Sequence, residues 1–172
     1  MPGHVLVCPR AHLRSVAAAP DDVVQDLEAL ALETTAFLRR ALGRLVHAFE
    51  HGSGACTSRV ACSIEHAHLH LIPADVDVWA ELDLMADWRP LAPGAAPLRE
   101  ASAGLEYLAY TSPRGERWLA TTADGFPSQM LRQVFARALG REDEWNWRTR
   151  PARPLVEATV ELFADAAVLA EA

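Results

Sequence analysis

Three histidines separated by single residues are the part of this sequence best suited to chemistry. His66, His68 and His70 alternate with apolar residues inside the segment 62–74. Successive side chains of an extended strand point to opposite faces, so we expect the three imidazoles to share one face of a strand. Each buried ring nitrogen left without a hydrogen bond costs about 1–3 kcal/mol. A row of three therefore predicts a functional site.

Zinc binding is one alternative for this row, because zinc takes three or four nitrogen, sulfur or oxygen ligands. No acid or cysteine elsewhere in the sequence has a matching spacing, so we predict no metal site. An inert structural strand is the other alternative, and it leaves the cost of burying three imidazoles unexplained. A chemical role is therefore the first hypothesis.

The composition limits the class of protein. A chain of 172 residues with 51% hydrophobic and 23% charged residues suits one globular domain. A formal net charge of −7 argues against a general nucleic-acid binder. No apolar run approaches the roughly 20 residues that cross a bilayer, so we expect no membrane contact. Three cysteines without a Cys-x-x-Cys pair predict reduced thiols in a cytoplasmic protein, with Cys8 buried.

The first half of the chain predicts a strand, a long helix and two further strands. The β-branched segment 4–9 is typical of a buried strand, and an apolar period of three to four then predicts a helix up to Gly43. The next strand is expected over 44–50, followed by a loop from residue 51 to 60. The histidine strand comes next and ends at Pro73. The two strands should form a hairpin with functional residues near one end.

The second half predicts helices around a second hairpin. Prolines and a glycine between residues 90 and 97 indicate a loop, and Ser128 is expected to cap a helix that ends near Gly140. The whole chain therefore predicts an α+β fold, an antiparallel sheet covered by helices. The elements expected in this half are a helix near 79–88, strands at 106–111 and 117–122, and helices at 128–140 and 154–169.

Three segments together resemble the histidine-triad (HIT) superfamily of nucleotide hydrolases and transferases. They are Pro2-Gly3-His4 with the strand after it, Phe49-Glu50-His51-Gly52, and the histidine row closed by Pro73, with the long helix in the family's order. The resemblance covers roughly residues 2 to 75. It implies a HIT-like core at 1–75 and a C-terminal extension at 76–172 that packs on the same domain.

The resemblance implies roles for individual residues. In the family the middle histidine attacks the α-phosphorus of a nucleotide, which assigns the nucleophile to His68. Imidazole titrates close to neutral pH, so a neutral nucleophile is available. His66 and His70 would flank the phosphate and protonate the leaving group. His4 would hydrogen-bond into the triad, and Ser63 matches a position that contacts phosphate.

The resemblance also leaves parts of the site open. Ser128, Gln129 and Arg132 are similar to a C-terminal extension of one bacterial branch, and they are candidates to bind the substrate phosphates from a helix N-terminus. Glu50 stands where several branches carry an amide, and its repulsion from phosphate predicts that it faces a ribose, a cation or solvent. The helix or two strands that precede the first motif in the family, and that form part of its base pocket, are not found here. We therefore expect either that the start codon is assigned too far downstream, or that the base pocket is open or filled by another segment.

The first hypothesis is therefore an enzyme. It would cleave a nucleoside phosphate ester, anhydride or phosphoramidate through a nucleotidyl-histidine intermediate, as a hydrolase or a transferase. No cofactor is expected to be required, although a divalent metal is compatible with the chemistry. The resemblance implies a homodimer, and the cysteine pattern predicts a cytoplasmic location. The alternatives are a catalytically weak nucleotide-binding module and a metal-binding protein.

Overall fold

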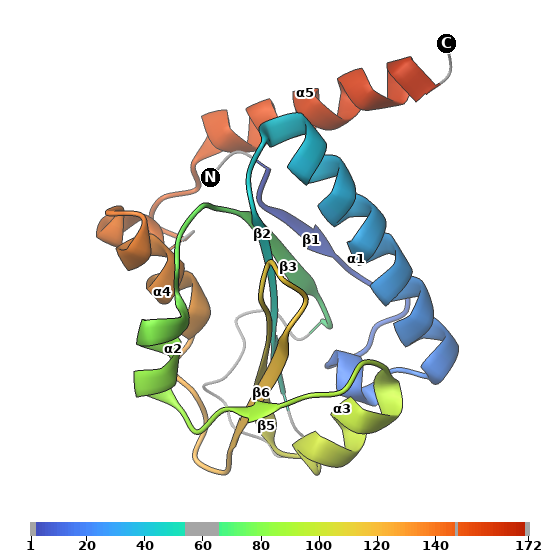
Figure 1. The fold of residues 1–172 in the computed structure, drawn as a ribbon, viewed down its shortest axis with the longest axis vertical. Helices are drawn as coiled ribbons and strands as arrows, with labels where there is room; N and C mark the ends of the chain where they lie inside the picture. The colour runs from blue at the N-terminus through green and yellow to red at the C-terminus, as the bar shows by residue number, and fades with distance from the viewer. Residues whose placement is uncertain (1–2, 54–65, 147, 171–172) are drawn as a thin grey trace.

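The expected α+β fold is confirmed by a computed structural model, which describes residues 3–53, 66–146 and 148–170. Within these residues one six-stranded antiparallel sheet runs in the order β1-β3-β2-β5-β6-β4, with helices on both of its faces (Figure 1). The strands are β1 (Val5–Val7), β2 (Val46–Gly52), β3 (Leu69–Pro73), β4 (Arg89–Pro90), β5 (Glu106–Thr111) and β6 (Arg117–Thr122). The α-helices are α1 (Asp21–Leu42), α2 (Trp79–Met85), α3 (Ala95–Ser102), α4 (Met130–Ala138) and α5 (Arg153–Ala170).

Helix α1 follows its predicted periodicity and ends where glycine allows it to end. Its first turn carries two acidic residues, which interact favourably with the helix dipole. Gly43 adopts a left-handed conformation with φ 63° and closes the helix. The buried residues Val24, Leu27 and Leu38 lie on the side that faces the sheet. The helix therefore fixes the position of one layer of the fold.

The predicted hairpin of β2 and β3 is present, with Phe49 opposite His70. The boundary of the loop was wrong, because β2 continues through His51 to Gly52. Strand β5 supplies the partner that extends it, and Gly52 lies opposite Tyr107 in that register. A Cβ atom at position 52 would collide with the Tyr107 ring, so this extension requires glycine.

The second hairpin, β5 and β6, matches its predicted bounds. The loop predicted between residues 90 and 97 is confirmed only for residues 91–94, because its two ends belong to regular elements. Arg89–Pro90 forms the edge strand β4 against β6, an edge position where proline is tolerated. Helix α3 then begins at Ala95. Pro97 lies in its first turn, where a missing N–H has no intrahelical partner to lose. Pro90 and Pro97 therefore lie within a strand and a helix, at positions that do not require their N–H.

The cap predicted at Ser128 was also wrong. Helix α4 begins at Met130, and its N-cap residue is Gln129, which has φ 58° and makes no side-chain capping bond. The Met130 N–H instead donates to the Pro127 carbonyl at 3.1 Å. The backbone turn therefore satisfies the donor that the serine hydroxyl was expected to satisfy.

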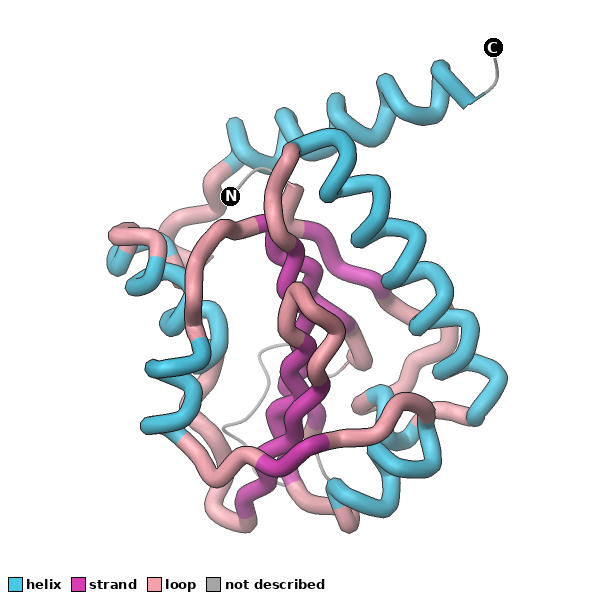
Figure 2. The backbone as a smooth tube through the Cα atoms, viewed as in Figure 1, coloured by secondary structure: helices cyan, strands magenta, loops and turns pink. Residues whose placement is uncertain are grey.

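The sheet separates two hydrophobic cores. We call the side covered by α1 and α3 the α1 face, and the side covered by α2 and α4 the α4 face (Figure 2). Strand alternation in β2 sends Glu50 to the α1 face and its neighbours Phe49 and His51 to the α4 face. Helix α5 crosses the end of α1, where the rings of Phe37 and Phe163 lie 4.7 Å apart (Figure 1).

The exposure of Cys8 differs from its prediction, and the helices can be checked for a membrane span. Cys8, predicted to be buried, is exposed, because β1 ends at Val7 and the chain turns into a loop. Cys56 and Cys62 lie outside the described residues. Among the helices of the described ranges, none has the length and apolar character to span a membrane.

Candidate active site

The histidine row does not lie on a single strand as predicted. Strand β3 begins at Leu69, so only His70 belongs to it, and His66 and His68 precede it. The strand begins there because its partner β1 ends at the pair Val7 and Leu69. The segment before it is held by the loop after β1. The Ala67 N–H donates to the Leu13 carbonyl at 2.6 Å, and His66 Nε2 donates to the Pro9 carbonyl at 2.9 Å.

His68 is held in one tautomer by its own chain. Its Nδ1 lies 2.7 Å from the His66 carbonyl oxygen, which can only accept a hydrogen bond. The hydrogen of the neutral ring therefore resides on Nδ1, and the lone pair resides on Nε2. Burial is the main cause that lowers the pKa of His68 below its ordinary value, so the neutral ring is favoured near pH 7. The side chain therefore offers a nucleophilic nitrogen.

His70 and His4 form a hydrogen-bonded imidazole pair. His4 Nε2 lies 2.9 Å from His70 Nδ1, the contact that was expected for His4. Burial is the first cause that lowers the pKa of His4 to about 3, and it lowers the pKa of His70 well below its ordinary value. Both rings are therefore neutral at pH 7 and share one hydrogen. The Phe49 ring stacks on His70 at 4.3 Å and fixes its plane.

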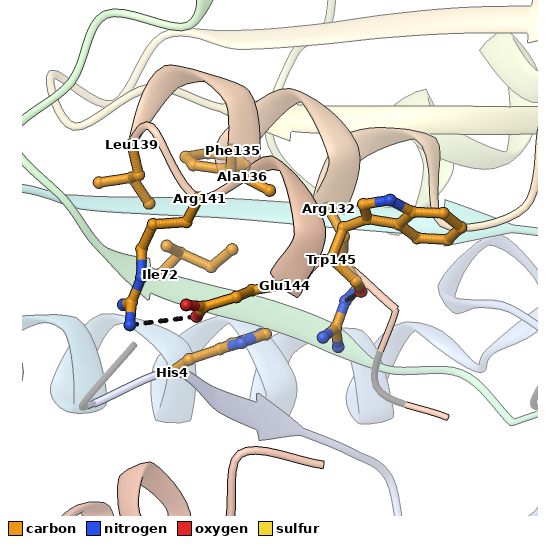
Figure 3. Close-up of a pocket in the computed structure, with 9 residues that line it drawn as sticks. All are labelled: His4, Ile72, Arg132, Phe135, Ala136, Leu139, Arg141, Glu144 and Trp145. Atoms are coloured by element: carbon orange, nitrogen blue, oxygen red, sulfur yellow. Dashed lines mark hydrogen bonds and ion pairs between the residues drawn. The ribbon is translucent and has the colours of Figure 1, made fainter. Parts of the chain in front are cut away.

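Arg132 brings positive charge to this pair from helix α4. It lines a cavity of about 60 Å³ together with His4 and Trp145, and its Nε donates to the Trp145 carbonyl at 3.0 Å (Figure 3). Its charge is a secondary cause of the lowered pKa values of His4 and His70. Across the same cavity Arg141 and Glu144 form an ion pair at 3.1 Å (Figure 3). The site therefore contains a cation beside neutral imidazoles.

The pair formed by His51 and Glu106 was not predicted from the sequence. His51 Nε2 donates to Glu106 Oε1 at 2.8 Å, and the Phe126 N–H donates to the same oxygen at 2.7 Å. His51 also contributes to lowering the pKa of His68 and His70. The alternation of β2 was the available signal, since His51 is two residues from Phe49 and shares its face. It was overlooked because Gly52 indicated a loop.

The prediction for Glu50 was wrong. The side chain is 1% exposed and points into the α1 face, not toward a ribose, a cation or solvent. Its Oε1 accepts from the Val16 N–H at 2.8 Å and its Oε2 accepts from the Tyr107 hydroxyl at 2.6 Å. Burial raises the pKa of Glu50 to about 7, against the opposing effect of these hydrogen bonds. The residue joins the sheet to the turn at residues 15–18.

The remaining predicted residues are placed as follows. Ser63 lies outside the described residues. Ser128 is half-buried, and its carbonyl accepts from Gln133 Nε2 at 3.2 Å. The Oε1 atom of Gln129 is buried and, within the described part of the chain, accepts no hydrogen bond. Among the described residues, neither Ser128 nor Gln129 forms a hydrogen bond to His4, His66, His68 or His70.

A metal centre is not formed by the side chains that the structure describes. In residues 3–53, 66–146 and 148–170, no group of three His, Cys, Asp or Glu side chains is arranged to hold a metal ion. His66 and His68 each use one ring nitrogen on a backbone carbonyl, and His70 uses one on His4. The arrangement supports the chemistry of neutral imidazoles next to a guanidinium.

The fold and site together define an α+β protein in which a neutral histidine, a histidine pair and an arginine lie together on the α4 face of the sheet. Comparison with protein families matches residues 1–77 to the HIT domain. The first 77 residues of the chain belong to the HIT superfamily. This match includes His4, α1, β2 and the histidine row. A comparison with curated protein sequences gave no match.

Proposed function

We propose that this protein is a HIT-type nucleotide hydrolase or nucleotidyltransferase in which His68 is the nucleophile. The observation that carries the proposal is the hydrogen bond from His68 Nδ1 to the His66 carbonyl, which leaves the lone pair on Nε2. The lowered pKa of His68 keeps that nitrogen unprotonated near neutral pH. Membership of the first 77 residues in the HIT superfamily supports a nucleotide as the substrate.

The reaction would proceed in two displacements. Nε2 of His68 attacks the α-phosphorus, a bond from nitrogen to phosphorus forms, and the bond from phosphorus to the leaving group breaks. The leaving group departs with that electron pair and takes a proton from a flanking histidine. Water or another acceptor then attacks the phosphorus and releases His68, returning a proton to the flanking base. The same two steps serve a hydrolase or a transferase, and the acceptor decides which.

The flanking histidines have distinct proposed roles. If His4 donates its Nε2 hydrogen to His70 Nδ1, then His70 carries its own hydrogen on Nε2 and can donate to a phosphate oxygen or leaving group. His66 is anchored to the Pro9 carbonyl and positions the turn that holds His68. Arg132 would stabilise the negative charge of the phosphate from α4.

Further elements of the proposal rest on the resemblance. Ser63, Ser128 and Gln129 remain proposed substrate contacts, and the buried Gln129 oxygen is a suitable acceptor for a ligand donor. We propose that the hairpin β5 and β6, which continues the sheet beside β2, takes part in enclosing the base. A cytoplasmic homodimer that needs no cofactor remains a prediction, as does a core bounded at residue 75.

The test is to trap the intermediate. The full chain is incubated with an adenylated phosphoramidate, quenched in base to preserve phosphohistidine, and digested for mass spectrometry. We expect an adenylyl adduct on His68 and release of AMP over time. His68→Ala should form no adduct and should lose turnover by about 10³-fold or more. Circular dichroism checks that the variant is folded.

The control is Gln25→Ala, which removes an exposed polar side chain on α1, away from the histidines. It should retain both the adduct and turnover. Turnover by His68→Ala at the wild-type rate would exclude the proposed nucleophile. Binding of AMP by a wild-type protein that forms no adduct and releases no product would instead support the nucleotide-binding module.

A further inference from the structure

A cavity of about 440 Å³ lies on the α1 face, on the opposite side of the sheet from the histidines. Helix α1 covers it, β2, β3 and β5 form its floor, and the turn between β5 and β6 borders it. The volume falls within the range of small-molecule sites, roughly 300–1,000 Å³. His4, His66, His68 and His70 do not line it. A ligand in this cavity would therefore bind apart from the site on the α4 face.

The cavity results from small side chains on both of its walls. Val24 and Leu27 pack one end of α1 to the fold, and the buried Leu38 packs the other. Between them the helix presents Ala31 and Thr35, and the sheet presents Ala48 and Ala109. Protein interiors leave few voids larger than a water molecule, so a space of this size needs an explanation.

The chemistry of the lining distinguishes an interior from a mouth. The interior is mainly apolar and is formed largely by valine, leucine and alanine side chains. Glu50 also lines it, but its two carboxyl oxygens already accept hydrogen bonds from the Val16 N–H and the Tyr107 hydroxyl. The mouth carries the guanidinium groups of Arg39, Arg114 and Arg117.

The acidic groups near the mouth leave it with an excess of positive charge. Glu28 is paired with Arg117 at 2.7 Å, and Glu116 accepts from the Ser112 hydroxyl at 3.0 Å on the same turn. Arg39 donates to the Pro113 carbonyl. Arg39, Arg114 and Arg117 therefore face a single lining carboxylate at the mouth, Glu28, in a chain whose net charge is −7.

We propose that this cavity binds a small amphiphilic anion, with an acyl or similar apolar chain under α1 and its carboxylate at Arg39 and Arg114. Apolar walls exclude a nucleotide or sugar, whose polar groups would lose their hydrogen bonds to water. The excess of arginine favours an anionic head over a neutral or cationic one. The proposal does not depend on the function proposed for His68.

The experiment is calorimetric titration of the full chain with decanoate below its micelle concentration. We expect saturable binding of one decanoate per chain, unchanged by saturating AMP. Ala31→Leu fills the cavity from the helix and should weaken binding by at least about tenfold, because the added methyl groups occupy the space of the chain. If Ala31→Leu does not fold, Thr35→Leu provides the same test. The matched control is Ala80→Leu, at an exposed position on α2.

The charge is tested separately from the shape. Arg114→Gln should weaken the binding of decanoate by about three- to tenfold, as expected for loss of one exposed ionic contact. The binding of 1-decanol, which has no charge, should be unchanged. Arg150→Gln is the matched control at an exposed arginine outside the cavity. Absence of saturable binding, full binding by Ala31→Leu, or displacement by AMP would overturn the proposal. Cosedimentation with phosphatidylglycerol vesicles in the absence of decanoate binding would indicate a membrane lipid and would also overturn it.

Discussion

His4 and Glu50, which lie on opposite faces of the sheet, are buried ionisable groups of opposite kinds. On the α4 face burial lowers the pKa of His4 to about 3, and on the α1 face it raises the pKa of Glu50 to about 7. Both shifts have the same main cause, because a low-dielectric interior disfavours the charged form of either group. The consequences differ. The neutral histidines keep unprotonated ring nitrogens next to a cavity, whereas both carboxyl oxygens of Glu50 accept hydrogen bonds from the fold.

Neighbouring residues of β3 provide the strongest test of this contrast. His70 faces α4 and Leu71, fully buried, faces α1. We expect His70→Ala to lower turnover of a nucleotide substrate by about 100-fold, as for loss of an acid–base group. Leu71→Ala should lower the free energy of unfolding by about 3 kcal/mol and leave the turnover of the folded fraction within about twofold. Turnover at 15 °C and urea denaturation measure the two effects.

Equal losses of turnover in the two variants would show that the faces are not functionally separate. Retention of wild-type turnover by His70→Ala would remove this histidine from the proposed chemistry. The outcome for Leu71→Ala is then a control for indirect damage to β3.

Glu50 should make the protein less stable as pH rises. Its folded pKa of about 7 lies above the unfolded value of 4.5, so the folded state binds more protons between these values. Stability is therefore highest below pH 4.5 with respect to this group and declines as pH rises to 7. Glu50→Gln should be more stable than the wild type at pH 8 by about 2–3 kcal/mol, with little difference at pH 4.5.

Urea denaturation at both pH values measures the difference, and Glu33→Gln, at an exposed position on α1, serves as the control. A destabilised Glu50→Gln at pH 8 would mean that the charged carboxylate is favoured by Val16 and Tyr107. In that case burial would disfavour the charged form of His4 but not that of Glu50.

His4 should produce the opposite dependence on pH. Its folded pKa of about 3 lies below the unfolded value of 6.5, so the unfolded state binds more protons between these values. Stability is therefore present above pH 6.5 and is lost as pH falls. The His4→Gln side chain can still form a hydrogen bond with His70. This variant should reduce the loss of unfolding free energy between pH 6.5 and 5 by about 1–2 kcal/mol. Thermal melts across this range measure it, with Gln25→Ala, at an exposed position on α1, expected to follow the wild type.

A pair of alanines compares how tightly the two faces are packed. Ala120 is 1% exposed in the core of the α4 face and pairs with Leu108 of β5, whereas the next residue of β5, Ala109, lines the cavity of the α1 face. Ala120→Leu should lower the free energy of unfolding by about 1–3 kcal/mol through overpacking. Ala109→Leu should change it by less than about 0.5 kcal/mol, because the cavity accepts the added methyl groups. Equal costs in urea denaturation would contradict this difference.

Much of the fold followed from local patterns. The period of α1 and the glycine after it predicted the helix, and Pro113-Arg114-Gly115 between two alternating segments predicted the hairpin of β5 and β6. The family resemblance was carried by residues within the first 77, where the HIT domain matches. Such signals are local because helix caps and turns depend on residues a few positions apart.

Several of the errors share one cause, which is that a strand needs a partner. His66 and His68 alternate like strand residues, yet β1 ends before it can pair with them. His51 and Gly52 resemble a loop, yet β5, more than 50 residues later, extends β2 through them. Cys8 is exposed for a related reason, because β1 ends one residue before it.

The sequence by itself determined that three histidines lie close together in the chain within an α+β fold, and the family resemblance added His4 as their fourth member. Only the tertiary structure decided that Glu50 enters the core, that His51 pairs with Glu106, and that Arg132 lies by His4. These outcomes depend on contacts between residues far apart in the chain. Burial and charge pairing are set by what packs against a side chain, and a local pattern does not contain that information.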